Sequence, residues 1–148
     1  MQEPLPEARE YGYGDITVGM KEHRRYKISH GVYGHFLAAF DDRSPIHVDE
    51  AYAKACGHEG MVMHGTLLNG FLSHFVGMYF PGKNSLLLSV DIRYAQPSYL
   101  GDEITLEAEV ARKLDAQKVI VLNVVLKNTT RDCIAARGRV QVMMKDES

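Results

Sequence analysis

The chain has 148 residues and a mass of 16.6 kDa, a length typical of one domain. A composition of 45% hydrophobic and 24% charged residues is that of a soluble globular protein, which excludes membrane-embedded, fibrous and disordered chains. The formal net charge of −2 is spread along the chain, so we expect no basic face for nucleic acid.

The cysteines and the N-terminal residues indicate the cell compartment. Cys56 and Cys133 are far apart and form no C-x-x-C pair, so neither a disulfide framework nor a zinc knuckle is expected. The first residues carry no basic and apolar leader, which predicts a cytoplasmic protein. Residues 1–14 are polar and lack periodicity, and they predict a flexible N-terminal arm before one domain over residues 15–148.

The first half of the chain predicts one strand followed by helices. Residues 21–28 form the strand, and Ser29 is placed to cap a helix over residues 31–40. A turn-forming cluster and Pro45 then predict an ordered loop over residues 42–47, and a short helix is expected over residues 50–55. Residues 64–80 repeat apolar residues every four positions opposite a small, polar face, which predicts a long central helix enclosed by other elements.

The second half alternates with period two, which indicates strands. Residues 88–94, 103–110 and 134–144 each place apolar side chains on one face, and residues 119–126 are apolar on both faces, as in a central strand. One strand, then helices, then four strands predicts an α+β fold. In this fold a curved antiparallel sheet wraps around the long helix.

Two motifs resemble ligand sites without having the required context. The seven histidines include no His-Glu-x-x-His and no suitable helical pair, so no metal is expected. Gly77 to Lys83 approximates a phosphate-binding loop, but it follows a helix and Asn84 occupies the Ser/Thr position. We interpret it as a Pro-Gly turn.

The candidate chemistry lies around Pro45 and at the start of the long helix. Asp42 and His47 are five residues apart, so a carboxylate and an imidazole would converge on one water molecule for acid/base catalysis. The same spacing also fits an Asx-turn beside an exposed histidine. Gly65 would present a backbone N–H at the positive end of the helix dipole to an oxyanion, or would simply permit close packing.

In order and spacing, these motifs resemble the MaoC-like, (R)-specific enoyl-CoA hydratase family of hotdog-fold proteins, whose signature reads roughly G-D-x-N-P-x-H-x-D followed by H-G. The resemblance extends from residue 15 onward and is carried by residues 41–49, 51–53, 64–65, 80–83 and 94–102. It implies a single hotdog domain that forms a homodimer or a higher homo-oligomer, with two sheets joined edge to edge.

The resemblance also implies a function in fatty acid metabolism. The chain would be a lyase that interconverts trans-2-enoyl and (R)-3-hydroxyacyl thioesters, with CoA or acyl carrier protein as part of the substrate and with no cofactor. Asp42 and His47 would activate water, and the N–H of Gly65 would hold the thioester oxyanion. Ser44, Pro45 and His64 would support them.

Two positions depart from the family signature. Asp41 replaces its Gly, and like-charge repulsion between Asp41 and Asp42 is expected to raise the pKa of one carboxyl group. Ser44 replaces its Asn, which leaves open an alternative function as a catalytically idle acyl-thioester-binding subunit. Hotdog thioesterases and type II fatty-acid dehydratases resemble one another in having an acidic residue on the central helix. Residues 66–80 contain none, which argues against both.

Overall fold

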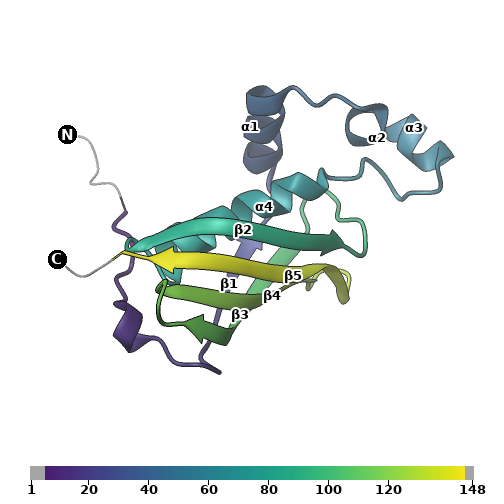
Figure 1. Cartoon of the computed structure of the whole chain (residues 1–148). Helices are drawn as coiled ribbons and strands as arrows, with labels where there is room; N and C mark the ends of the chain where they lie inside the picture. The colour runs from purple at the N-terminus through teal and green to yellow at the C-terminus, as the bar shows by residue number, and fades with distance from the viewer. Residues whose placement is uncertain (1–5, 146–148) are drawn as a thin grey trace, which may run out of the picture.

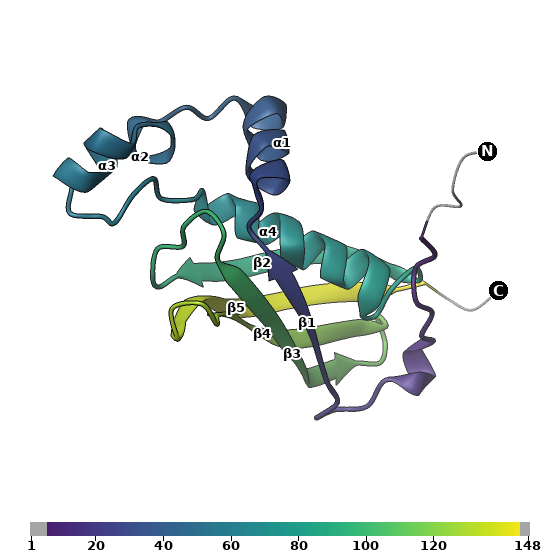
Figure 2. The same ribbon diagram turned by 180° about the vertical axis from the view of Figure 1, so that it is seen from behind.

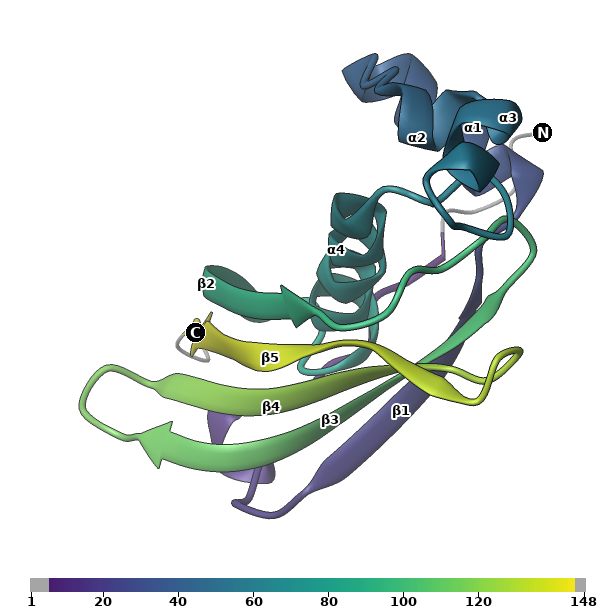
Figure 3. The ribbon, with the colours of Figure 1, turned by 90° about the vertical axis from the view of Figure 1, so that its right-hand side faces the viewer.

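The structure is a computed structural model that describes residues 6–145. Within these residues, five antiparallel strands form one sheet in the order β1-β3-β4-β5-β2. The sheet curves around helix α4 (Figure 3), which confirms the α+β fold. The elements in chain order are η1 (Tyr13–Asp15), β1 (Lys21–Lys27), α1 (His30–Phe40), α2 (Pro45–Val48), α3 (Glu50–Ala55), α4 (Gly65–His74), η2 (Phe75–Tyr79), β2 (Ser85–Tyr94), β3 (Glu103–Leu114), β4 (Val119–Asn128) and β5 (Cys133–Met144).

The central helix has the predicted extent, because α4 continues into the π-helical turn η2. Its apolar side packs on the sheet, and Leu67, Leu72 and Phe75 are fully buried there. The opposite side, which includes Thr66 and Ser73, is exposed, so the expected enclosure of this helix by other elements is wrong. The sheet covers one face of the helix only. Neither α4 nor any other helix in residues 6–145 combines the length and apolarity needed to cross a bilayer.

The strand predictions are confirmed except at β2. The central position of β4 and the buried alternation of β3 are as predicted. In β2, Leu88 is 48% exposed, Tyr94 46% and Val90 37%, so the predicted half-buried face is wrong at these positions. Two causes are visible: β2 lies at the sheet edge, and a bulge between Leu87 and Ser89 shifts Leu88 out of the alternation.

Helices α1 to α3 form a helical arm (residues 30–55) that stands over one end of the sheet and the start of α4 (Figures 1 and 2). The Ser29 side chain accepts a hydrogen bond from Val32 N at 3.1 Å, as predicted for the cap of α1. The loop predicted over residues 42–47 is wrong from Pro45 onward, where α2 begins. Proline is well accommodated in the first turn of a helix because its missing N–H would have no partner there.

The chain before β1 runs along the far end of α4. Arg9 N donates to Met78 O at 2.9 Å, and Arg9 O accepts from Lys83 N at 3.0 Å. The Tyr11 ring packs edge-on against Phe80, with centroids 5.3 Å apart. Residues 9–11 of the predicted arm are therefore attached to the domain, whereas residues 1–5 lie outside the described residues. The domain boundary at residue 15 stays a prediction.

Candidate active site

Three side chains come together where the helical arm meets the start of α4. Asp42, His47 and His64 each place one carboxylate oxygen or ring nitrogen within 4.8 Å of the others. Asp42 lies in the turn after α1, His47 lies in α2, and His64 caps α4. The fold thus brings the predicted pair and the predicted supporting histidine to one place.

Backbone contacts fix the imidazole of His47. Its Nδ1 donates to the carbonyl oxygen of Val62 at 2.7 Å. A neutral imidazole has one N–H, so this hydrogen bond leaves the lone pair on Nε2. The backbone carbonyl of His47 accepts from the Tyr33 hydroxyl at 2.7 Å, which ties α2 to α1. His47 is half-buried, so the alternative with an exposed histidine is wrong.

The carboxylate of Asp42 is held by Ser44. Its Oδ1 accepts from the Ser44 hydroxyl at 2.8 Å and from Ser44 N at 3.2 Å, so the Asx-turn of the alternative interpretation is present as well. The hydroxyl bond and then the backbone bond lower the pKa of Asp42, outweighing a smaller desolvation effect that raises it, and the nearby histidines lower it further. The expected rise is therefore wrong for Asp42. Asp41 forms an ion pair with Arg43 at 2.6 Å.

His64 links the members of this group. It is 2% exposed, and its Nε2 donates to the backbone carbonyl of Asp42 at 2.8 Å. Its ring stacks on His47, with centroids 4.0 Å apart, and packs on Phe36 at 4.7 Å. Among the described residues, His64 Nδ1 has no hydrogen-bond partner. These residues offer the ligand types of a metal site, and the bonds of His47 Nδ1 and His64 Nε2 to backbone carbonyls leave the other nitrogen of each ring, His47 Nε2 and His64 Nδ1, to face a proton or another ligand. This arrangement suits proton transfer.

Gly65 is the first residue of α4, so its N–H lies among the donors that have no partner within the helix. A Cβ atom at this position would lie 3.1 Å from Cδ1 of Tyr94, which confirms the close-packing interpretation of Gly65. The Tyr94 hydroxyl donates to Asn69 Oδ1 at 2.7 Å and so holds the ring along the first turn of the helix. An available N–H and a tightly packed Cα thus occur at the same residue.

A cavity of about 320 Å³ opens beside these groups. Its lining comes from α2, from α4 and the residues before it, from the end of β2 and the segment that follows, and from β5. It comprises His47, Val62, Met63, His64, Gly65, Leu68, Tyr94, Ala95, Gln96, Pro97, Ser98 and Ala135. A larger hollow of about 390 Å³ over β1, β3 and β4 contains none of the candidate residues. The smaller cavity therefore holds the imidazole of His47 and the N-terminus of α4, and the carboxylate of Asp42 lies close to that imidazole.

Sequence reasoning missed two contributors to this site. Val62 acts through its backbone carbonyl, which no side-chain pattern reveals. Asn69 belongs to the small, polar face predicted for residues 64–80, to which no role was assigned. Its position four residues after Gly65 could have suggested that both lie on the same side of the helix.

Known proteins are similar to this chain in sequence and in fold. A model of the MaoC like domain matches residues 20–131. Over 107 residues, the chain is 30% identical to an (R)-specific enoyl-CoA hydratase from Aeromonas caviae, covering 72% of this chain and 80% of that protein. Over 114 residues, it is 28% identical to a 3-hydroxybutyryl-CoA dehydratase from Methylorubrum extorquens, covering 77% and 73%.

The same similarity extends to solved structures. The unliganded R-hydratase PhaJ1 from Pseudomonas aeruginosa superimposes with a TM-score of 0.86 at 26% sequence identity, covering 95% of this chain and 89% of that one. This match confirms the hotdog fold predicted from the sequence. Because the family model and the relatives each span more than two thirds of the chain, this protein belongs to the MaoC-like domain family.

Proposed function

We propose that this chain adds water reversibly across the C2–C3 double bond of a trans-2-enoyl thioester to give a (R)-3-hydroxyacyl thioester. Its relatives are named hydratases and dehydratases, which identifies the chain as an enzyme of that class. The observation that carries the assignment of residues is the convergence of Asp42 and His47 beside the N-terminus of α4.

The two side chains share the proton transfers. Asp42, whose pKa is lowered by its bonds to Ser44, is a carboxylate at neutral pH and accepts a hydrogen bond from the water. His47 exchanges protons at Nε2, because Val62 holds its Nδ1–H. As the water oxygen bonds to C3, the pair removes one proton from it and delivers one proton to C2, and the reverse sequence releases water.

Gly65 stabilises the charge that develops on the substrate. When oxygen adds to C3, electron density moves through C2 onto the thioester carbonyl oxygen. The N–H of Gly65 donates to this oxygen at the positive end of α4, where a fixed donor costs no reorganisation during the reaction. His64 supports the site by stacking on His47 and bonding to Asp42 O, and Pro45 starts the helix that carries His47.

The carrier of the acyl group is CoA or acyl carrier protein, and it belongs to the substrate. The proposed chemistry requires no metal or redox cofactor, because side chains perform both proton transfers. A cytoplasmic location and a role in fatty acid metabolism stay predictions. The alternative of an idle binding subunit rested on Ser44. That residue instead holds the Asp42 carboxylate in place, which favours an active enzyme.

The proposal includes a homodimer joined through β2. This strand lies at the sheet edge with β5 as its described neighbour, and Leu86, Leu88 and Val90 are exposed along it. An edge strand with exposed apolar residues is a template for pairing with another strand. A second copy that pairs β2 with β2 would cover these side chains and extend the sheet.

The direct test is loss of enoyl-thioester absorbance when the protein is mixed with crotonyl-CoA and with a longer trans-2-enoyl-CoA. We expect turnover, reduced about 10²–10⁴-fold in Asp42→Asn and His47→Ala. Asp41→Asn and His35→Ala are matched controls, because both side chains are exposed, and they should retain the wild-type rate. Absence of turnover with acyl-CoA binding intact would instead support the binding-only alternative.

A further inference from the structure

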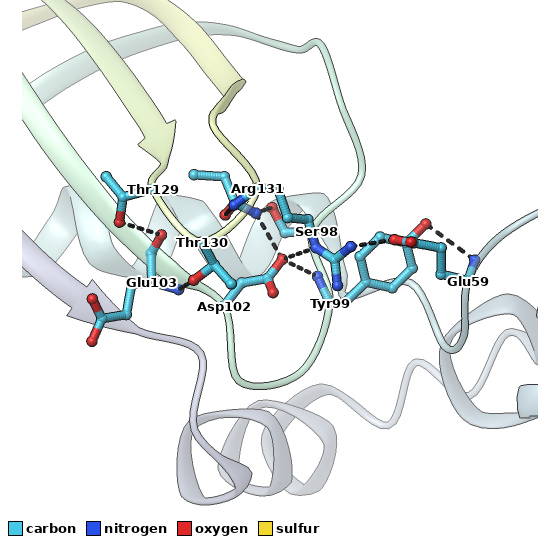
Figure 4. A network of polar contacts seen from close by, with 9 residues as sticks. Glu59, Ser98, Tyr99, Asp102, Glu103, Thr129, Thr130 and Arg131 are labelled. Carbon is cyan, nitrogen blue, oxygen red and sulfur yellow. Dashed lines mark hydrogen bonds and ion pairs between the residues drawn. The ribbon is translucent and has the colours of Figure 1, made fainter.

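A buried carboxylate lies outside the cavity and takes no part in the proton transfers described above. Asp102 is 2% exposed and directly precedes β3. Its Oδ2 accepts hydrogen bonds from Tyr99 N at 2.9 Å, from Asn128 Nδ2 at 2.7 Å and from Arg131 Nε at 2.7 Å (Figure 4). A buried charge is costly unless donors surround it, so this carboxylate fixes the groups that it binds.

Arg131 extends this network to the end of the helical arm. Its guanidinium pairs with Asp102 through Nε and with Glu59 through Nη1 (Figure 4). The guanidinium carbon also lies 4.1 Å from the centroid of the Tyr99 ring. The Tyr99 hydroxyl accepts from Glu59 N at 3.4 Å. Arg131 thus connects residue 59, which follows the helical arm, to residue 99 in the loop before β3.

The two segments that Arg131 connects, around residues 59 and 99, lead through hydrogen bonds to His47. Val62 and Tyr99 form an isolated antiparallel bridge, and Met63 N donates to Ser98 O at 2.9 Å. Val62 N donates to Ile46 O at 3.0 Å, and Val62 O accepts from His47 Nδ1 at 2.7 Å. Two paired backbone segments, residues 98–99 and 62–63, therefore separate the carboxylate of Asp102 from the imidazole of His47.

We propose that Asp102 and Arg131 are positioning residues that hold the Val62 carbonyl against His47 Nδ1 and so fix the tautomer and orientation of the His47 imidazole. The inference rests on the proposed function, and it extends the working site to residues that contact neither substrate nor water. The helical arm stands away from the sheet (Figure 1), so the attachment of residues 59–63 is one of the contacts that fix where His47 lies. A displacement of about 1 Å in a catalytic group lowers turnover about 10²-fold.

The experiment compares Asp102→Asn and Arg131→Lys with the wild type. Asn keeps the shape of Asp102 but loses its charge, and Lys keeps the charge of Arg131 but cannot reach Asp102 and Glu59 together. We expect kcat to fall about 10–100-fold, because the imidazole of His47 is no longer held in one orientation. The second measurement is ¹⁵N NMR of the histidine ring nitrogens, in which the His47 signals are identified by their loss in His47→Ala. In the wild type, the neutral imidazole of His47 should carry its proton on Nδ1. Both variants should show a mixture of tautomers.

Lys127→Met is the matched control, because it removes an exposed ion pair with Glu107 (3.2 Å) that is outside this network. It should leave both kcat and the His47 resonances unchanged. If Asp102→Asn does not fold, Arg131→Lys and Tyr99→Phe, which removes the hydroxyl that binds Glu59 N, provide the same test. Folded variants that keep the Nδ1–H tautomer would overturn the positioning role, whatever their turnover. Equal turnover of wild type and His47→Ala would instead contradict the proposed function. The NMR measurement of the His47 tautomer does not depend on that function, so the two failures are distinguishable.

Discussion

The imidazole of His64 stacks on the imidazole of His47, with ring centroids 4.0 Å apart and ring planes inclined by 29°. His64 also donates a hydrogen bond to the backbone carbonyl of Asp42. One buried side chain therefore contacts both members of the proposed catalytic pair, the histidine through its ring and the aspartate through its backbone. The histidine and the turn that carries the carboxylate of the proposed site are therefore both held by His64.

Substitution of His64 separates these two contacts. His64→Phe keeps an aromatic ring against His47 but loses the hydrogen bond to Asp42 O, and we expect kcat to fall about 10-fold, the equivalent of one hydrogen bond. His64→Ala loses both contacts and leaves a cavity, so it should also lower the free energy of unfolding by about 2 kcal/mol. Steady-state kinetics and urea unfolding measure the two effects. A wild-type rate in His64→Phe would show that the hydrogen bond to Asp42 is dispensable.

Ser44 determines the pKa of Asp42. The hydrogen bond from its hydroxyl stabilises the charged carboxylate, so Ser44→Ala should raise the pKa of Asp42 toward its ordinary value. Because the folded-state pKa is lowered, the stability from this bond is present above the unfolded pKa and is lost as the pH falls through the folded pKa. The stability difference between wild type and Ser44→Ala should therefore be largest near neutral pH and disappear in acid.

The measurement is a ¹³C NMR titration of the Asp42 carboxyl group, combined with urea unfolding across the same pH range. Ser44→Asn is the informative companion, because the family signature has Asn at this position and its amide can also donate. It should keep the pKa of Asp42 low. An unchanged pKa in Ser44→Ala would contradict the role assigned to the hydroxyl.

Gly65 packs so closely on the Tyr94 ring that a Cβ atom at this position would crowd it. In Gly65→Ala the methyl group would lie 3.1–3.2 Å from three ring atoms of Tyr94, whose hydroxyl is anchored on Asn69. Either the ring or the N–H of residue 65 must move, and we expect kcat to fall about 10-fold or more. Helix stability should not fall, since Ala is a better helix former than Gly.

A double-mutant cycle separates this contact from other effects of the substitution. If crowding by Tyr94 displaces the N–H, Gly65→Ala should cost less activity in a Tyr94→Leu background than in the wild type. If the two substitutions act independently on kcat, the ring is not the cause. Thermal unfolding of all four proteins confirms that the comparison is made between folded forms.

Local patterns predicted most of the fold, because periodicity and capping depend on neighbouring residues. Ser29 was recognised as a cap, and the extent of α4 and the strand character of residues 103–110 followed from their repeats. The bulge at Leu88 was not predictable, because it depends on how β2 pairs with β5. Strand order is equally non-local, so the edge position of β2 had no signal in the apolar pattern of residues 88–94.

The candidate site likewise has features that local sequence predicts and features that depend on tertiary packing. A Pro-stiffened turn predicted that Asp42 and His47 would converge. The stacking of His64 on His47 joins residues 17 positions apart through tertiary packing, which the motif spacing does not encode. The network of Glu59, Asp102 and Arg131 spans up to 72 positions of the sequence and depends on a loop that folds back on the helical arm. The sequence places Asp41 beside Asp42 and so predicted a raised pKa for one of the two carboxyl groups, but it does not show that Ser44 binds the carboxylate of Asp42 and lowers its pKa.

The exposed edge of β2 provides a test of the proposed homodimer. Leu88 is exposed in the single chain, so Leu88→Lys should leave the folding of the subunit nearly unaffected. In a β2–β2 dimer, however, the same substitution would bury two charges near the new strand pair, and edge lysines disfavour such pairing. We expect sedimentation analysis to show a dimer for the wild type and a shift toward monomer for Leu88→Lys.

Val18→Lys is the matched control, because Val18 is also an exposed apolar residue but lies outside the sheet. It should remain dimeric. Tyr94 ends β2 and lines the cavity, so loss of the dimer should also lower turnover, because the edge strand then loses the partner that fixes its end. A wild-type protein that sediments as a monomer, or a Leu88→Lys variant that dimerises as tightly as Val18→Lys, would place the subunit contact elsewhere on the molecule.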